Sequence, residues 1–141
     1  MEVAMRNWRA ITFVVAALMP TLTAARADDG AIIDRWYSAL LVADRTELSD
    51  LLADDVRIKL EDLGVEQNKQ EFIASIDNWQ GAVAGAAIRH RIAKSEGGVT
   101  TVIACYDFPN NDMLMQETFS VTDNRITASS QAAIAESCDG Y

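Results

Sequence analysis

The sequence predicts an α+β fold in which three N-terminal helices pack on a strongly curved antiparallel sheet. Three amphipathic helical stretches, interrupted by one strand, come first, and four long segments of alternating polarity follow them. Helices that precede a run of strands are typical of α+β domains, where the helices cover one face of the sheet. Residues 28–141 are long enough for one compact domain, and we expect a single domain there.

Residues 1–27 have the pattern of a secretory signal peptide. Arg6 and Arg9 precede an apolar run at residues 10–19, and Ala25 and Ala27 are the small residues of a cleavage site. The apolar run is about half of the ~20 residues that a membrane span needs. We therefore expect cleavage after Ala27, a periplasmic or secreted protein, and no membrane attachment after cleavage.

The charge and the cysteines limit the classes of partner. The chain has 12 Lys and Arg against 21 Asp and Glu, a net charge of −9, and so should repel nucleic acid. One histidine and two isolated cysteines give no metal-ligand spacing, and no cofactor is expected. In an oxidising compartment Cys105 and Cys138 can form a disulfide, the alternative being one buried and one exposed thiol.

The first half of the chain predicts the helices. Residues 31–43 carry apolar side chains at helical spacing. Asp44 and Glu47 form a candidate capping box for a second helix, which should end near Asp55. Residues 56–60 then alternate as a half-buried strand.

A third helix and the sheet follow. Asn68 and Glu71 form a second candidate capping box, and residues 80–85 are expected to be a flexible link. Polarity then alternates through four strands separated by turn-forming residues. These strands cover about residues 88–92, two central segments within 99–121 joined by a turn at 109–112, and residues 125–133.

Glu117 is the most informative residue of the predicted sheet, because it interrupts an apolar row. Its neighbours on the same face of the strand are Met113, Met115, Phe119 and Val121. Burial there would raise the pKa of the carboxyl and favour its neutral form, which can donate a hydrogen bond. The alternative is a structural carboxylate at a pocket rim, paired with an arginine.

Two more residues are candidates for chemistry. His90 lies on the same face of its strand as Ile88 and Ile92. It is either a general base acting with Glu117 or a hydrogen-bonded core residue. Tyr106 is the candidate pocket residue of the first central strand.

The segments RWYSALLVADRTELSDLLADDVRIKL (35–60) and NKQEFIASIDNW (68–79), followed by four strands, resemble the nuclear transport factor 2-like (NTF2-like) superfamily. This superfamily includes SnoaL-like polyketide cyclases and ketosteroid isomerases. The resemblance implies a cone-shaped α+β barrel with a pocket at its wide end.

The resemblance also implies positions for the three isomerase residues. The oxyanion tyrosine falls on Trp36, with Tyr37 beside it and rotated away by about 100°. The general base falls on Leu60, and the inward acid falls on Glu117. Only the acid keeps its chemical type, so isomerase activity is not expected.

Three functions remain open from the sequence. The leading one is an exported domain that binds a small apolar ligand, oriented by Glu117, His90 and Tyr106. The second is a cyclase, isomerase or dehydratase with His90 as base and Glu117 as proton donor. The third is a homodimerisation module that pairs through the outer sheet face. The predicted pocket wall consists of Trp36, Tyr37, Leu60, Tyr106, Met113 and Met115, although Trp36 and the two methionines also suit a plain core.

Overall fold

A computed structural model of the chain describes residues 25–141, with side chains from Asp29 onward. The signal-peptide prediction falls largely on residues 1–24, which lie outside the described residues, so it stays a prediction. In the described range, no helix is both long and apolar enough to cross a membrane.

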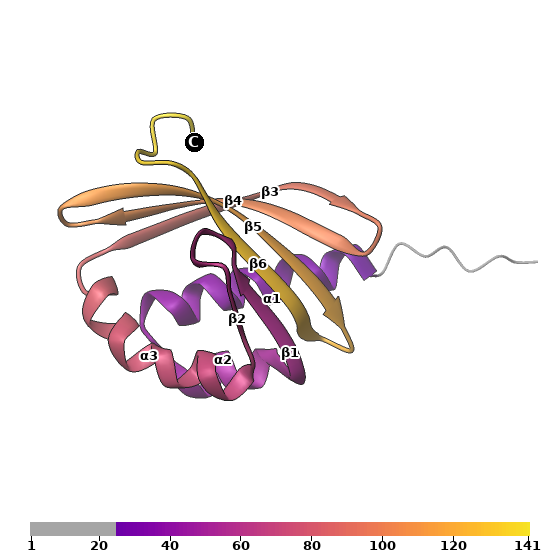
Figure 1. Ribbon diagram of the computed structural model, residues 1–141. Helices are drawn as coiled ribbons and strands as arrows, with labels where there is room; N and C mark the ends of the chain where they lie inside the picture. Colours follow the sequence, from indigo (N-terminus) through magenta and orange to yellow (C-terminus); the bar gives the residue numbers. More distant parts are fainter. Residues whose placement is uncertain (1–24) are drawn as a thin grey trace, which may run out of the picture.

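A single curved sheet wraps around three helices (Figure 1). The predicted α+β class is therefore confirmed, with the helices in the N-terminal half of the domain. The elements in chain order are α1 (Ala25–Leu41), α2 (Arg45–Leu51), β1 (Leu52–Leu60), a short 3-10 helix (Glu61–Leu63), β2 (Val65–Gln67), α3 (Lys69–Val83), β3 (Ala87–Glu96), β4 (Val99–Phe108), β5 (Asn111–Thr122) and β6 (Arg125–Ala135).

The six strands lie in the order β2-β1-β6-β5-β4-β3. Every neighbouring pair is antiparallel except β1 and β6, which run parallel. Gly97 and Gly98 close the β3–β4 hairpin with φ values of 60° and 77°, and the β5–β6 hairpin turns at Asp123 and Asn124, also at positive φ. Two-residue hairpin loops of this kind need left-handed backbone, which Gly, Asn and Asp supply.

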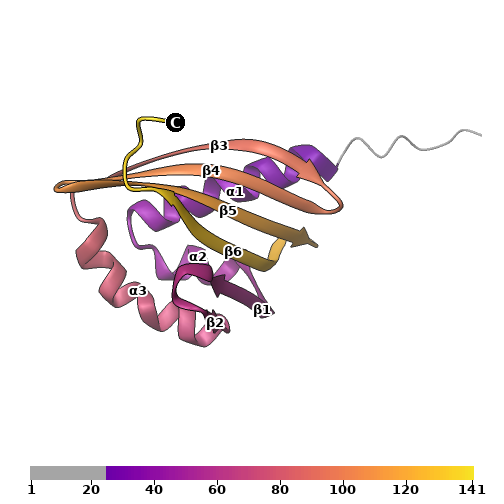
Figure 2. The same cartoon turned by 45° about the horizontal axis from the view of Figure 1, so that its top comes forward.

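Register shifts give the sheet its curvature. One extra residue lies in β3, between Ile92 and Lys94, and two more lie in β6, where the pairing with consecutive residues of β5 skips Thr127 and Ile134. A bulge bends its strand and increases the local twist. The sheet consequently curls over α1, and all three helices lie on its concave side (Figure 2).

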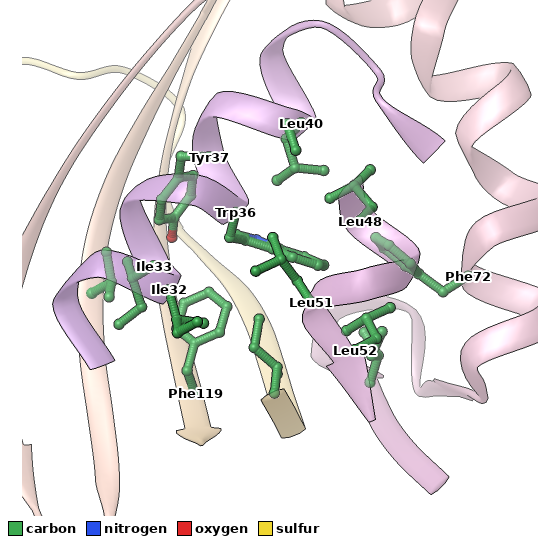
Figure 3. Packing of buried hydrophobic residues seen from close by; sticks show 14 of the residues in the cluster. Ile32, Ile33, Trp36, Tyr37, Leu40, Leu48, Leu51, Leu52, Phe72 and Phe119 are labelled. Atoms are coloured by element: carbon green, nitrogen blue, oxygen red, sulfur yellow. The ribbon is translucent and has the colours of Figure 1, made fainter. Parts of the chain in front are cut away.

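The core lies between α1 and the concave face of the sheet. Trp36 is fully buried, and its ring stacks on Phe72 of α3 at a centroid distance of 5.3 Å and meets Phe119 of β5 edge-on at 6.1 Å. Figure 3 shows Trp36 among leucines of α1 and α2. The buried residues of α1 and α2 in this core are Ile32, Ile33, Trp36, Tyr37, Ala39, Leu40, Leu48 and Leu51.

Two predicted boundaries are wrong. Helix α2 ends at Leu51, not near Asp55, because Leu52 already pairs with Ile126 of β6. Helix α3 runs through most of the predicted link to Val83, which is buried at 4% exposure. Burial of that apolar side chain stabilises the last helical turn more than the neighbouring Gly and Ala residues destabilise it.

The two predicted capping boxes differ in outcome. Asn68 and Glu71 form the full reciprocal pair at the start of α3. Asp44 accepts from the Glu47 amide at 3.0 Å, but the Glu47 carboxylate binds Arg35 at 2.7 Å instead of closing the box. The box at Asp44 is therefore only half formed.

The C-terminal tail covers part of the convex face. Cys105 and Cys138 form the expected disulfide, with their Cα atoms 5.7 Å apart. Tyr141 then lies under the guanidinium of Arg89, 4.6 Å from the ring centroid. The outer sheet face proposed for homodimerisation includes Gln116, Thr118, Ser120 and Thr127. Dimerisation through this face stays a prediction.

Candidate functional site

A pocket of about 250 Å³ opens between α3 and the concave face of the sheet. Helix α3, strands β4, β5 and β6, and single residues of α1, β1 and β2 contribute its wall. The lining residues are Leu40, Leu60, Gln67, Phe72, Ser75, Ile76, Trp79, Tyr106, Phe108, Met113, Met115, Glu117 and Gln131.

The period of β5 aims Glu117 into this pocket. Alternate residues of a strand share one face, so Met113, Met115 and Glu117 all project from β5 toward α3 and line the pocket. Glu117 is the deepest of the three, with no exposed surface, whereas the methionines are half-buried. The apolar row of β5 that was predicted from the sequence therefore lines the pocket, and Glu117 is its one carboxyl.

Two tyrosines hold the Glu117 carboxyl from different elements. The Tyr37 hydroxyl, on α1, donates to Oε2 at 2.7 Å, and the Tyr106 hydroxyl, on β4, donates to Oε1 at 2.6 Å. Distances of 2.5–2.7 Å are typical of O–H···O⁻ bonds with a charged acceptor. The arginine partner considered from the sequence is thus replaced by two phenols.

The hydrogen bond from Tyr106 to Glu117 joins two residues that are not cross-strand partners. Tyr106 pairs with Met113, whereas Glu117 pairs with Val102, four residues back along β4. At about 3.3 Å per residue this is ~13 Å along the strand, so the two side chains must lean toward each other over Ala104. The methyl side chain of Ala104 leaves the space for this.

Burial and hydrogen bonding act on the Glu117 pKa in opposite directions. Desolvation raises the pKa of this carboxyl above its usual value, while the hydrogen bonds from Tyr106 and Tyr37 lower it. Burial also raises the pKa of both phenols, and the nearby Glu117 charge raises it further. Both tyrosines consequently stay protonated and act as donors to the carboxyl.

His90 does not line the pocket. Its Nε2 lies 2.7 Å from Oδ1 of Asp34, and its ring stacks on Tyr37 with centroids 4.3 Å apart. Tyr37 thus contacts both His90, through its ring, and Glu117, through its hydroxyl. The hydrogen-bonded alternative for His90 describes this arrangement better than a base that faces a ligand.

The predicted wall residues fall into two groups. Leu60, Tyr106, Met113 and Met115 line the pocket with Glu117. Trp36 and Tyr37 do not, because Trp36 fills the core and Tyr37 lies behind Glu117. The expectation that Tyr37 rotates away from the isomerase-like position misses its bond to Glu117.

Helix α3 and strands β4 and β6 add wall residues that were not expected from the sequence. Trp79 and Phe108 stand edge-on at 6.0 Å, and Ser75 and Gln131 supply polar atoms. Trp79 follows Phe72 and Ile76 at helical spacing, and Phe108 shares a strand face with Tyr106, so sequence periodicity could have indicated the aromatic wall. No sequence signal indicated Gln131, because its position in the pocket wall depends on the register between β5 and β6.

The lining residues suit binding and proton transfer more than metal chemistry. Within residues 25–141, no three His, Cys, Asp or Glu side chains are grouped so that they could hold a metal ion. The pocket offers one buried carboxyl, one phenol, and aromatic and methionine surface. Such a site can orient a small organic molecule by one polar group.

Comparisons with solved structures show the fold. The chain is similar to an NTF2-like protein of unknown function from Burkholderia xenovorans LB400, with 15% identity, a TM-score of 0.65 and coverage of 77% of this chain and 84% of that one. It is also similar to an LEH-like epoxide hydrolase from M. tuberculosis, with 15% identity, a TM-score of 0.58 and coverage of 76% and 83%.

A third similar structure contains a small molecule. It is a protein with a ketosteroid isomerase-like fold from Catenulispora acidiphila DSM 44928 in complex with trimethylamine, at 15% identity, a TM-score of 0.58 and coverage of 74% and 87%. No protein-family model matches the chain, and no curated protein matches it either. At these identities the comparisons establish an NTF2-like, ketosteroid isomerase-like fold.

Proposed function

We propose that this NTF2-like domain is an exported small-molecule-binding protein. Its pocket would hold a compact, largely apolar ligand, and one polar group of that ligand would meet Glu117 and Tyr106. Export rests on the signal-peptide pattern of residues 1–27, and the Cys105–Cys138 disulfide is in keeping with an oxidising compartment.

The observation that carries the binding proposal is a buried polar group inside an apolar pocket. Glu117 has no exposed surface, yet it contributes to the pocket wall beside Met113, Met115 and Phe108. Burying a carboxyl costs free energy that plain packing does not recover. A hydrogen bond from a bound ligand to Glu117 would offset part of that cost, which explains why the pocket contains a carboxyl.

The size of the pocket limits the ligand. Ligand sites of about 300–1,000 Å³ are usual for drug-sized molecules, and this pocket of about 250 Å³ lies just below that range. We therefore expect a molecule of one or two small rings rather than a four-ring steroid. The trimethylamine complex of a protein with this fold supports a ligand of small size.

Acid–base catalysis is the second candidate, and one observation favours it. Burial raises the pKa of the Glu117 carboxyl, which favours the protonated form that a general acid needs. The His90–Glu117 pair of the sequence-based hypothesis lacks support, since His90 binds Asp34 outside the pocket lining. A catalytic version would need Glu117 to act with Tyr106.

Ligand-induced stabilisation tests the binding proposal. Thermal unfolding of the full chain is recorded with a panel of compact cyclic alcohols, ketones and amines at increasing concentration. A ligand that binds only the native state raises Tm in a saturable way. The proposal requires at least one such ligand, and a panel without any overturns it.

Two neighbouring residues of α3 provide a matched pair of variants. Ser75→Leu adds bulk inside the pocket, whereas Ala74→Leu adds bulk on the exposed side of the same helix. The first should abolish the ligand-dependent rise in Tm, and the second should keep it. Equal loss in both variants would place the binding elsewhere.

A further inference from the structure

We infer that the pocket selects organic cations, either a protonated amine or a quaternary ammonium with a compact apolar body. The positive group would lie beside Glu117, and the apolar body would lie against Trp79, Tyr106 and Phe108. This inference rests on the proposed function, because it names the ligand class of the same pocket. Four independent features of the pocket support it.

The first feature is the direction of the hydrogen bonds. Tyr37 and Tyr106 each have one hydroxyl proton, and both protons are donated to Glu117. An ionised carboxylate only accepts, and it has about four lone-pair sites, of which the tyrosines use two. In the ionised form of Glu117, which a bound cation would stabilise, Glu117 and the Tyr106 oxygen therefore present acceptors, and no proton, to a ligand.

The other polar wall groups repeat this pattern. Ser75 Oγ donates to the carbonyl of Phe72 at 2.6 Å, and Trp79 Nε1 donates to the carbonyl of Leu40 at 2.7 Å. The donors left among the lining side chains are the amides of Gln67 and Gln131, which are only half-buried. A ligand that donates hydrogen bonds fits the deep end of the pocket better than one that accepts them.

The second feature is an aromatic wall. The rings of Tyr106 and Phe108 are stacked with centroids 6.1 Å apart, and Trp79 stands edge-on to both at 6.0 Å. Aromatic faces attract cations within about 6 Å of the ring centroid, and Trp does so best. Aromatic side chains grouped in this way around a buried carboxylate suit an ammonium group.

The third feature is an unbalanced charge. None of the ion pairs of the described residues includes Glu117, and no Lys, Arg or His lines the pocket. A buried carboxylate normally has a charged partner, because desolvation is otherwise uncompensated. A cationic ligand would be that partner.

The fourth feature is the long-range field. The chain has a net charge of −9, and removal of residues 1–27 would take away three arginines and only one glutamate. An acidic protein raises the local concentration of cations and repels anions. The electrostatic field of the whole protein therefore favours a positively charged ligand, as the pocket wall does.

The methionines make the test site-specific. The chain has five, of which Met113 and Met115 line the pocket, while Met1, Met5 and Met19 precede the described residues. The full chain is labelled with ¹³C in its methionine methyl groups, and the two pocket signals are assigned with Met113→Leu and Met115→Leu.

The probes are matched in shape and differ in charge. Cyclohexylamine, protonated at pH 7, is compared with cyclohexanol and with cyclohexanecarboxylate, and tetramethylammonium tests a cation without N–H donors. We expect cyclohexylammonium to shift the Met113 and Met115 methyl signals and to bind at least tenfold more tightly than cyclohexanol. Cyclohexanecarboxylate should not shift them.

Glu117→Gln removes the charge and keeps the side-chain shape, whereas Glu136→Gln removes one charge from an exposed residue outside the pocket. The preference for the cation should disappear in the first variant and persist in the second.

Two results would overturn the inference, and they differ in scope. If cyclohexanol binds as tightly as cyclohexylammonium, the cation preference is wrong, while the binding function stands. If no probe shifts either methyl signal, the binding function fails with it. A cation preference that survives Glu117→Gln would also overturn the assignment, because the charge would then be recognised elsewhere.

Discussion

The Tyr37 hydroxyl on the first helix lies 2.7 Å from Oε2 of Glu117 on the fifth strand, 80 residues away in sequence. This bond fixes the inner end of the pocket to the helix that crosses the concave face. The Tyr106 hydroxyl holds the other carboxylate oxygen at 2.6 Å. Glu117 is therefore clamped in one position, with its remaining lone pairs available to a ligand.

We predict that removing either phenol raises the pKa of Glu117 further. Each tyrosine lowers that pKa by donating a hydrogen bond to the charged form. A hydrogen bond to a charged group contributes about 1.5–3 kcal/mol, so its loss should move the titration of Glu117 upward. The measurement is a ¹³C NMR titration of the glutamate side-chain carboxyls in the Tyr37→Phe and Tyr106→Phe variants.

The two variants serve as controls for each other. Both variants should shift the titration of the Glu117 carboxyl, because both hydroxyls bind it. Tyr106 lines the pocket and Tyr37 does not, so only Tyr106→Phe should remove a polar atom from the pocket wall. An unchanged Glu117 titration in both variants would contradict the hydrogen-bond arrangement.

We predict a specific pH dependence of stability from Glu117. Burial raises its pKa in the folded state above that of the unfolded chain, about 4.3. The folded state then binds the proton more tightly, so the wild type loses stability relative to Glu117→Gln as the pH rises from about 4 through the folded pKa. Below pH ~4 the difference should be constant, because both states are then protonated.

Urea unfolding at a series of pH values measures this difference. Glu136→Gln is the control, since it makes the same substitution at an exposed residue outside the pocket. A difference in unfolding free energy between the wild type and Glu117→Gln that does not change with pH would contradict the raised pKa.

Much of the fold could be predicted from the sequence because its signals are local. Strict alternation in residues 113–121 placed Glu117 on the inner face, and the Asn68–Glu71 pair marked the start of α3. The predicted end of α2 was wrong because the helix stops where Leu52 pairs with Ile126, a residue far away in the sequence. Helix propensity carries no information about such a partner.

The site was predictable only in part, for a similar reason. Glu117, Tyr106 and the methionines follow from strand period, and all of them line the pocket. The role of Tyr37 depends on the angle at which α1 crosses the sheet, which sequence spacing does not determine. His90 has the right strand face for an inward residue, yet the stacked Tyr37 ring lies between it and the pocket end at Glu117.

We predict that His90 makes no direct contribution to ligand binding. His90 binds Asp34 and lies outside the pocket lining. His90→Gln should therefore leave the affinity for any pocket ligand within about twofold, as measured by the methionine methyl titration. A tenfold loss of affinity in His90→Gln would show that His90 takes part in ligand binding, and it would favour the acid–base enzyme hypothesis.

The disulfide is expected to contribute substantially to stability. It joins residues separated by 33 positions, and closing a loop of that length contributes roughly 3–4 kcal/mol on the chain-entropy model. The Cys105→Ala, Cys138→Ala double variant should lose about that free energy of unfolding in urea. Since the bridge lies on the convex face, ligand binding should persist at a temperature where the variant is folded.

The most direct test of the account is a crystal structure of the protein soaked with cyclohexylamine. We expect density for the ligand between Met115, Trp79 and Tyr106, with its nitrogen within hydrogen-bond distance of Glu117. Ligand density in the pocket with the nitrogen turned away from Glu117 would contradict the cation assignment. A pocket closed by its own side chains, with no ligand in it, would contradict the binding function itself.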